Sequence, residues 1–181
     1  MAGRARDVVA GGAAAAVWAL QEPLDRRVVG CDYSDVAILG KAVTRGRAWW
    51  PAGFALHVAN GMLFGLAFHE VRRRRPVDGR ALALGMALGE HLALYPLSGL
   101  VDRHHPRRGS SGIPPLLSNR RAFAQATWRH ALFGVVLGRL AARQVVARSD
   151  GSTGFSIRTI GTGAPPVASS SRSSGRNPYA V

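Results

Sequence analysis

The apolar residues of this chain fall into four blocks that are separated by polar, arginine-rich connections. The longest block, residues 48–68 (AWWPAGFALHVANGMLFGLAF), carries no formal charge and is followed closely by the run Arg72–Arg75. At 1.5 Å per residue, a helix of this length is about 30 Å long, close to the thickness of a bilayer's hydrocarbon core. The pattern therefore predicts a membrane-spanning helix at 48–68.

The other three blocks predict three more spans, so the expected fold class is all-α, a four-helix transmembrane bundle. The third block carries Glu90 and His91 at its centre and Pro96 near its end, and the fourth block is the least apolar. The expected spans are about 6–22, 48–68, 81–100 and 122–142.

The block at 6–22 admits two interpretations. Basic residues precede an apolar run, Val8–Leu20, that ends near the small residue Ala19, as in a cleavable signal peptide. The same run is also compatible with a short first membrane helix. An internal repeat, described below, favours the second interpretation because it requires this segment to be retained.

The connections and the C-terminal end are polar. Asp32 and Asp35 lie in the mixed-charge connection 23–47, where no further residues complete a metal site, so we expect a solvated loop. Within it, Val36–Val43 predicts a short interfacial helix, and Ser118-Asn119 predicts the N-cap of the fourth helix. Residues 148–181 are rich in Ser, Gly, Thr, Pro and Arg, a composition typical of disorder. The expected organisation is a membrane domain at 1–147 and a disordered tail at 148–181.

The formal net charge of +14 could indicate a nucleic-acid-binding protein. The basic residues, however, lie mainly in the connections and the tail, and no recognised nucleic-acid-binding motif is present. Basic residues beside apolar spans favour anionic lipid headgroups, so the expected partner is the lipid bilayer and not nucleic acid. The dense run at Arg72–Arg80 predicts that both termini lie on the cytoplasmic side of a bacterial inner membrane.

The chain resembles itself when it is shifted by 73 residues, and the matches fall on Gly, Pro and His. His57 then aligns with His130, and Pro23 with Pro96. Further matches are Ala10 with Ala83, Gly12 with Gly85, Ala14 with Ala87, Gly61 with Gly134 and Gly65 with Gly138. This offset predicts two duplicated helical hairpins, with the two histidines at equal depth facing the bundle interior.

Small residues recur at a spacing of four in each span. Positions four apart lie on one helix face, and small residues there allow close helix packing in lipid. We expect these faces to pack helices together within the bundle or in a homo-oligomer. The expected packing glycines are Gly12, Gly61, Gly65, Gly85, Gly89, Gly134 and Gly138.

Polar side chains inside the spans should face the bundle and find partners, because ionisable groups are costly in lipid. The candidates are Asn60, Glu90, His91 and Arg129. The simplest expectation is an interhelical pair between Glu90 and Arg129. The functional alternative is a path for protons along Glu90 and the histidines.

Two histidines at equal depth raise a second functional alternative. His57 and His130 could be the axial ligands of haem b, with glycines making room for the porphyrin. The simpler interpretation is that each histidine hydrogen-bonds across its interface, so no cofactor is expected. The adjacent pair His104-His105 lacks acidic or cysteine neighbours and is weak evidence for a metal site.

Known catalytic motifs, such as a nucleophile elbow or a phosphate-binding loop, are absent from the sequence. The four short spans, the HxxNGxxxG pattern from His57 and the basic connections resemble the uncharacterised small multi-pass membrane proteins of high-GC bacteria. The resemblance covers roughly residues 8 to 143 and implies location and fold but no activity. The expected function is a non-catalytic, helix-packing or interaction module in a membrane. A soluble, Gly-rich helical bundle is the alternative from outside the membrane.

Overall fold

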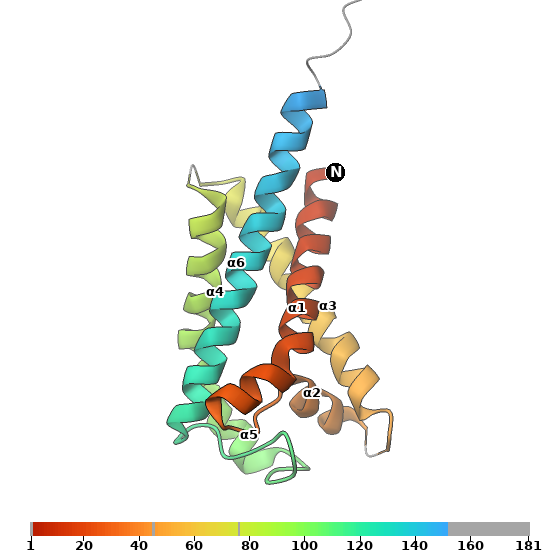
Figure 1. Ribbon diagram of the computed structural model, residues 1–181, viewed down its shortest axis with the longest axis vertical. Coiled ribbons are helices and arrows are strands. Elements are labelled where there is room, and N and C mark those ends of the chain that lie inside the picture. The colour runs from red at the N-terminus through yellow and green to blue at the C-terminus, as the bar shows by residue number, and fades with distance from the viewer. Residues whose placement is uncertain (1, 45, 76, 152–181) are drawn as a thin grey trace, which may run out of the picture.

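The computed structural model describes residues 2–44, 46–75 and 77–151, with side chains described through Ala142. This part of the chain forms helices and no β-strand, so the predicted all-α class is confirmed (Figure 1). In chain order the elements are α1 (Ala2–Val29), α2 (Asp35–Val43), α3 (Trp49–Arg72), α4 (Gly79–Leu94), the 3-10 turn η1 (Tyr95–Leu97), α5 (Ser98–His104) and α6 (Arg120–Gly151).

Four long helices form the bundle, and they pack as two pairs. Helix α1 packs mainly on α3, and α4 packs mainly on α6. Contacts between α1 and α6 join the pairs, whereas α3 and α4 barely touch. Figure 1 shows the start of α1 and the end of α6 at the same end of the bundle, with α2 and α5 at the opposite end. A helical bundle is confirmed, and its pairing is the one that a duplicated hairpin would produce.

The membrane assignment is less complete than the sequence predicts. Among the described helices, only α3 is long and apolar enough to cross a membrane by length and composition. The predicted third span, 81–100, is wrong as a single helix, since α4 ends at Leu94. Pro96 lies in the turn that follows, and its ring excludes continuation of the α-helical hydrogen bonds.

Helix α1 is longer than predicted. It continues past residue 22 to Val29 and includes Pro23, so the first part of the expected 23–47 loop is helical. Proline cannot donate the hydrogen bond that the Ala19 carbonyl would accept, and this loss kinks a helix. Figure 1 shows the last turns of α1 running at an angle to the rest of the helix. The kink directs these turns toward α6 instead of along the bundle axis.

Helices α2 and α6 begin close to where the sequence predicts. Helix α2 starts after Ser34, whose side chain accepts the backbone N–H of Ala37. Helix α6 starts after Asn119, whose Oδ1 accepts the N–H groups of Arg121 and Ala122. Helix α6 continues to Gly151, past the expected boundary at 148. The remainder of the predicted tail, 152–181, lies outside the described residues.

Glycines allow the helices within each pair to approach closely. A Cβ atom at Gly61 would collide with the Cβ of Ala15 and the carbonyl of Gly11, and one at Gly65 would collide with the backbone of Asp7. In the second pair, a Cβ at Gly134 would lie 2.7 Å from the Cα of Leu84. A Cβ at Gly138 would lie 2.9 Å from the Cα of Arg80.

Gly85 and Gly89 do not pack helices together within the bundle, which is one of the two roles expected of them. A Cβ added at either position would meet no atom within 4 Å, and both residues are exposed. Helix α4 instead packs through Ala83 and Ala87, which are fully buried against α6. Gly12 faces the side chain of Met62, whereas its neighbour Gly11 makes the close backbone approach to α3.

Candidate functional site

The most extensive polar site in the described part of the chain surrounds Arg129, whose side chain is 0% exposed. Its Nε and one terminal nitrogen donate to the two carboxylate oxygens of Asp25 at 2.6 and 2.7 Å. The other terminal nitrogen donates to Asp35 at 2.9 Å and lies 3.4 Å from Glu22. The guanidinium also donates to the Tyr33 carbonyl at 3.0 Å and stacks over the Tyr33 ring. We call Arg129, Glu22, Asp25, Tyr33 and Asp35 the arginine cluster.

Helix geometry explains how α1 supplies its share of this site. Trp18, Glu22 and Asp25 are spaced four and three residues apart, so they lie on one face of α1. The extension of α1 beyond Pro23 is what carries Asp25 to α6, where Gln125 and Arg129 are one turn apart. Gln125 also donates to Asp25, at 2.6 Å.

The N-terminus of α2 completes the arginine cluster. Glu22 accepts a hydrogen bond from the Ser34 hydroxyl at 2.5 Å and one from the backbone N–H of Asp35 at 3.0 Å. A side chain of α1 therefore provides hydrogen-bond acceptors for donors at the start of α2. Trp18 on α1 donates its indole N–H to Asp35 at 3.1 Å. The three helices α1, α2 and α6 are therefore held at one point.

Asp35 is held in its charged form. Burial alone would raise the pKa of this carboxyl, but the Arg129 guanidinium, assisted by the Tyr33 hydroxyl, outweighs burial, so the pKa of Asp35 lies below its usual value. Burial and the nearby charge of Asp35 raise the pKa of Tyr33 well above its usual value. The Tyr33 hydroxyl consequently stays protonated and donates to Asp35.

The arginine cluster is charge-rich and strongly interdependent. Three carboxylates face one guanidinium, a formal excess of two negative charges in a chain of net charge +14. Removing one partner of a buried ion pair leaves an uncompensated charge, which typically costs about 3–5 kcal/mol. We therefore regard Arg129 as the pin that joins the two helix pairs.

This arrangement corrects two expectations. Arg129 pairs with Asp25, Asp35 and Glu22, so the predicted Glu90–Arg129 pair is wrong. The expected solvated loop is also wrong for Asp35, which is bound to Arg129, although Asp32 is exposed. Glu22 and Asp25 continue the helical face of Trp18, and this spacing could have indicated the site. The prediction that the first helix ends at residue 22, before Pro23, concealed it.

The two histidines of the repeat both face the interior, and both lie against the ring of Trp18. The ring centroids of Trp18 and His57 are 5.0 Å apart, and those of Trp18 and His130 are 4.6 Å apart. The Nδ1–H of His130 donates to the Ala126 carbonyl at 2.8 Å. His57 is buried, and its Nε2 has no hydrogen-bond partner among the described residues.

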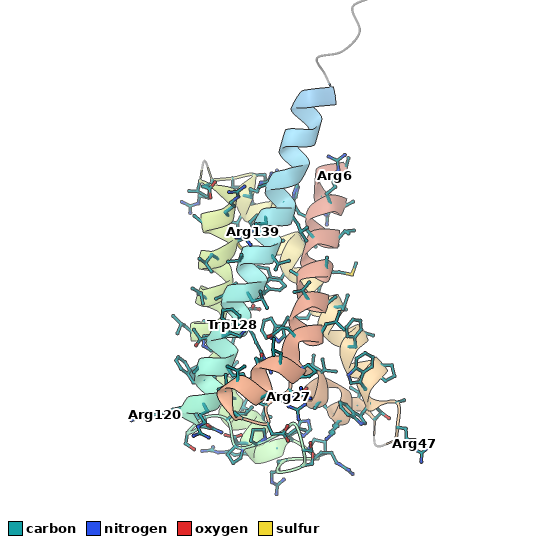
Figure 2. All side chains as sticks on the ribbon, in the orientation of Figure 1. Arg6, Arg27, Arg47, Arg120, Trp128 and Arg139 are labelled. Atoms are coloured by element: carbon teal, nitrogen blue, oxygen red, sulfur yellow. The ribbon has the colours of Figure 1, made fainter. Side chains whose placement is uncertain are left out.

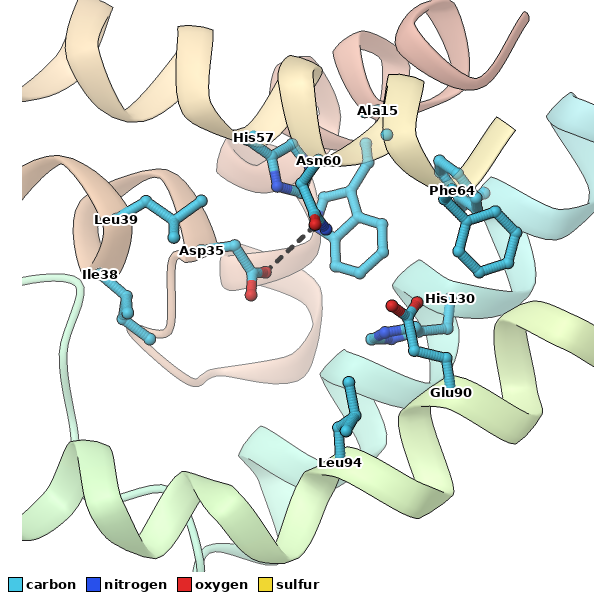
Figure 3. Close-up of a pocket in the computed structure, with 13 residues that line it drawn as sticks. Ala15, Asp35, Ile38, Leu39, His57, Asn60, Phe64, Glu90, Leu94 and His130 are labelled. Atoms are coloured by element: carbon cyan, nitrogen blue, oxygen red, sulfur yellow. Dashed lines mark hydrogen bonds between the residues drawn. The ribbon is translucent and has the colours of Figure 1, made fainter. Parts of the chain in front are cut away.

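A cavity of about 220 Å³ lies beside these rings, between α3 and α4 (Figure 3). Figure 3 shows Glu90 entering it from α4 next to His130, and His57 pointing into it from α3. Asn60, predicted as a buried polar residue, lines the cavity but is exposed. A second cavity of about 340 Å³ adjoins it and includes His91, whose Nε2 bonds the Thr127 hydroxyl at 2.9 Å.

The arrangement of His57 and His130 can be compared with what two axial ligands of haem b require. Two axial ligands must face each other across the porphyrin, yet the Trp18 indole contacts both His57 and His130 and occupies the space beside them. The residues in this arrangement do not fit a bis-histidine haem. His105, from the other histidine pair, instead bonds the carbonyl of Ile38 at 2.9 Å and anchors the loop that precedes α6.

Comparison with protein-family models, with curated proteins and with solved structures gave no match to this chain.

Proposed function

We propose that the chain is a multi-pass integral membrane protein, with α1, α3, α4 and α6 as its spans, that acts as a non-catalytic helical module. The observation that carries this proposal is the character of the outward faces. In the segments 8–20, 51–67, 81–94 and 122–138, all of which are described, no exposed residue carries a formal charge.

Large apolar side chains stand on these outward faces. Examples from the four helices are Val17, Leu63, Leu92 and Trp128, each at least 40% exposed. A soluble bundle turns polar residues outward, and continuous apolar surfaces on a monomer mark a membrane or partner interface. This bundle has the opposite arrangement, with apolar side chains outside and the charged Arg129 of α6 inside.

The charged residues gather at the ends of the bundle. Figure 2 shows Arg6 at one end and Arg27, Arg47 and Arg120 at the other, with Trp128 on the side between them. The segments without an exposed charge are about 20 to 26 Å long at 1.5 Å per residue. Long arginine side chains at their ends can extend to the headgroups, which accommodates a span slightly shorter than the hydrocarbon core.

Sodium carbonate extraction of cell membranes tests this proposal. An integral membrane protein stays in the pellet at alkaline pH and is released only by detergent. Recovery of the chain in the carbonate supernatant would refute the spanning proposal and favour the soluble bundle.

The cavity supports a second candidate function, in which the bundle conducts protons. It brings together Glu90, His57 and His130, the titratable residues expected from the sequence to form such a path. Reconstitution into liposomes with a pH-sensitive dye tests this candidate. Proton flux that exceeds that of protein-free liposomes and disappears in Glu90→Gln would support it, and flux equal to that of the variant would count against it.

A further inference from the structure

The cavity between α3 and α4 contains a negative group without a cationic partner. Glu90 is half-buried and lines the cavity, and its carboxylate takes part in no ion pair within the described part of the chain. Asp35 lies on another wall, at the edge of the arginine cluster with its formal excess of two negative charges. The walls of this cavity therefore attract a positive charge.

The histidines add unfilled hydrogen-bonding positions. Because Nδ1 of His130 donates to a carbonyl, its Nε2 is left as an acceptor in the neutral ring. His57 is only 6% exposed, yet its Nε2 has no partner among the described residues. Buried polar groups are nearly always hydrogen-bonded, so an orphan that lines a cavity indicates a missing partner.

Aromatic rings supply part of the remaining lining, together with aliphatic side chains such as Ile38 and Leu94. Phe64 and Phe133 meet edge to face with ring centroids 5.0 Å apart, and the Trp18 and Phe133 centroids are 6.2 Å apart. Aromatic faces attract cations and bury the apolar body of a ligand. A metal ion is disfavoured, because the described residues contain no group of three His, Cys, Asp or Glu side chains arranged to hold one.

From these observations we propose that the cavity binds a monovalent organic cation, an ammonium group on a small apolar body, with Glu90 as its counter-ion. The aromatic residues contact the apolar body, and the acceptor nitrogen of His130 takes an ammonium N–H. Because α3 and α4 make little contact, the ligand enters between these helices. This inference goes beyond the membrane proposal, since it depends on the cavity and not on what surrounds the bundle.

Isothermal titration calorimetry on the purified full chain in detergent tests the inference. The probes are 2-phenylethylammonium, its neutral counterpart 2-phenylethanol and the anion 3-phenylpropionate, which share an apolar body and differ in charge. We expect the ammonium to bind at least about tenfold more tightly than either counterpart. This comparison uses only the unmodified chain, so it does not depend on the folding of a variant.

Variants then identify the counter-ion. Glu90→Gln should weaken ammonium binding by at least about tenfold, whereas Glu90→Asp, which retains the charge, should weaken it less. Glu70→Gln is the matched control, because Glu70 is a half-buried acid at the end of α3, outside the cavity, that pairs with Arg73. Melting temperatures measured in parallel confirm that each variant is folded.

Three results would overturn the inference: no saturable binding of the ammonium, equal binding of the alcohol or the carboxylate, or unchanged ammonium binding by Glu90→Gln. The carbonate extraction has a separate outcome, so failure of the membrane proposal and failure of this one are distinguishable.

Discussion

Arg129 and Asp25 are joined by two hydrogen bonds of 2.6 and 2.7 Å across 104 residues of sequence. The pair links α1 to α6, the two helices through which the hairpins meet. Both side chains of the pair are buried, so water cannot replace either partner in these hydrogen bonds. The stability of the whole bundle should therefore depend on this contact more than on any single apolar residue.

Arg129→Leu should destabilise the bundle by about 3–5 kcal/mol, because it leaves three buried carboxylates without their guanidinium. Arg129→Lys should recover only part of this loss, since an ammonium cannot make the paired hydrogen bonds to Asp25. Chemical denaturation in detergent measures both. The matched control is Arg139→Leu, which removes an exposed arginine from the same helix and should change stability little. Equal effects at the two positions would contradict the pinning role.

The carboxylates of the arginine cluster should differ in how much each contributes to the free energy of unfolding. Asp25 accepts from Arg129, Gln21 and Gln125, so the amide of Asp25→Asn would place a donor against donors, at a cost of about 3 kcal/mol or more. Glu22 lies farther from Arg129, at 3.4 Å, and the cluster has excess negative charge. Glu22→Gln should cost less than about 1 kcal/mol. Denaturation curves of the two variants compare these costs, and a reversed order would refute the proposed roles.

Asp35 should make stability depend on acid pH. Its pKa in the folded chain lies below the unfolded value of about 3.9, so the unfolded state binds more protons in this range. The stabilisation from Asp35 is complete above the unfolded pKa and is lost as the pH falls through the folded pKa. Asp35→Asn should therefore be less stable at pH 7 and lose part of the acid dependence. Melting temperatures from pH 7 to pH 3 measure this, and an unchanged acid slope in the variant would contradict it.

Substitution should destabilise the fold at glycines in close helix contacts but not at exposed glycines. Gly61→Val should disrupt the α1–α3 contact, because a side chain there collides with Ala15 and Gly11. Gly85→Ala is the matched control in α4, where a Cβ meets no atom, and it should stabilise the helix by about 0.5–1 kcal/mol through helix propensity. Thermal melting in detergent distinguishes them. Similar losses at both positions would show that the helices pack differently.

Much of the helical framework could be predicted from hydropathy and capping signals. The blocks around α3 and α6 and the cap at Asn119 are local features, and the structure has them close to where the sequence indicates. The face that each helix turns toward the bundle interior was less predictable. Gly85 and Gly89 have the spacing of a packing face, but the identical spacing of Ala83 and Ala87 is the one that packs on α6.

The arginine cluster was predicted only in part, for a physical reason. The sequence predicts that Arg129 is buried, but it indicates Glu90 as the partner because both residues lie within apolar blocks. The actual partners, Asp25 and Asp35, lie in a polar connection that folds back through the kink of α1 and the N-terminus of α2. The helical spacing of Glu22 and Asp25 is a local signal, but the approach of Asp35 to Arg129 depends on the tertiary fold and leaves no periodic signal in the sequence.

Lipid exposure of the outward faces is the most direct test of the central claim, which is that all four long helices span a membrane. Cys31→Ser removes the only cysteine, and single cysteines at Val17, Leu63, Leu92 and Trp128 then carry nitroxide labels in proteoliposomes. Electron paramagnetic resonance compares collisions with oxygen, which concentrates in lipid, and with a water-soluble nickel complex. We predict that all four labels collide with oxygen and are shielded from nickel. Nickel access at Val17, Leu92 and Trp128 would contradict the claim and leave α3 as the only helix in the bilayer.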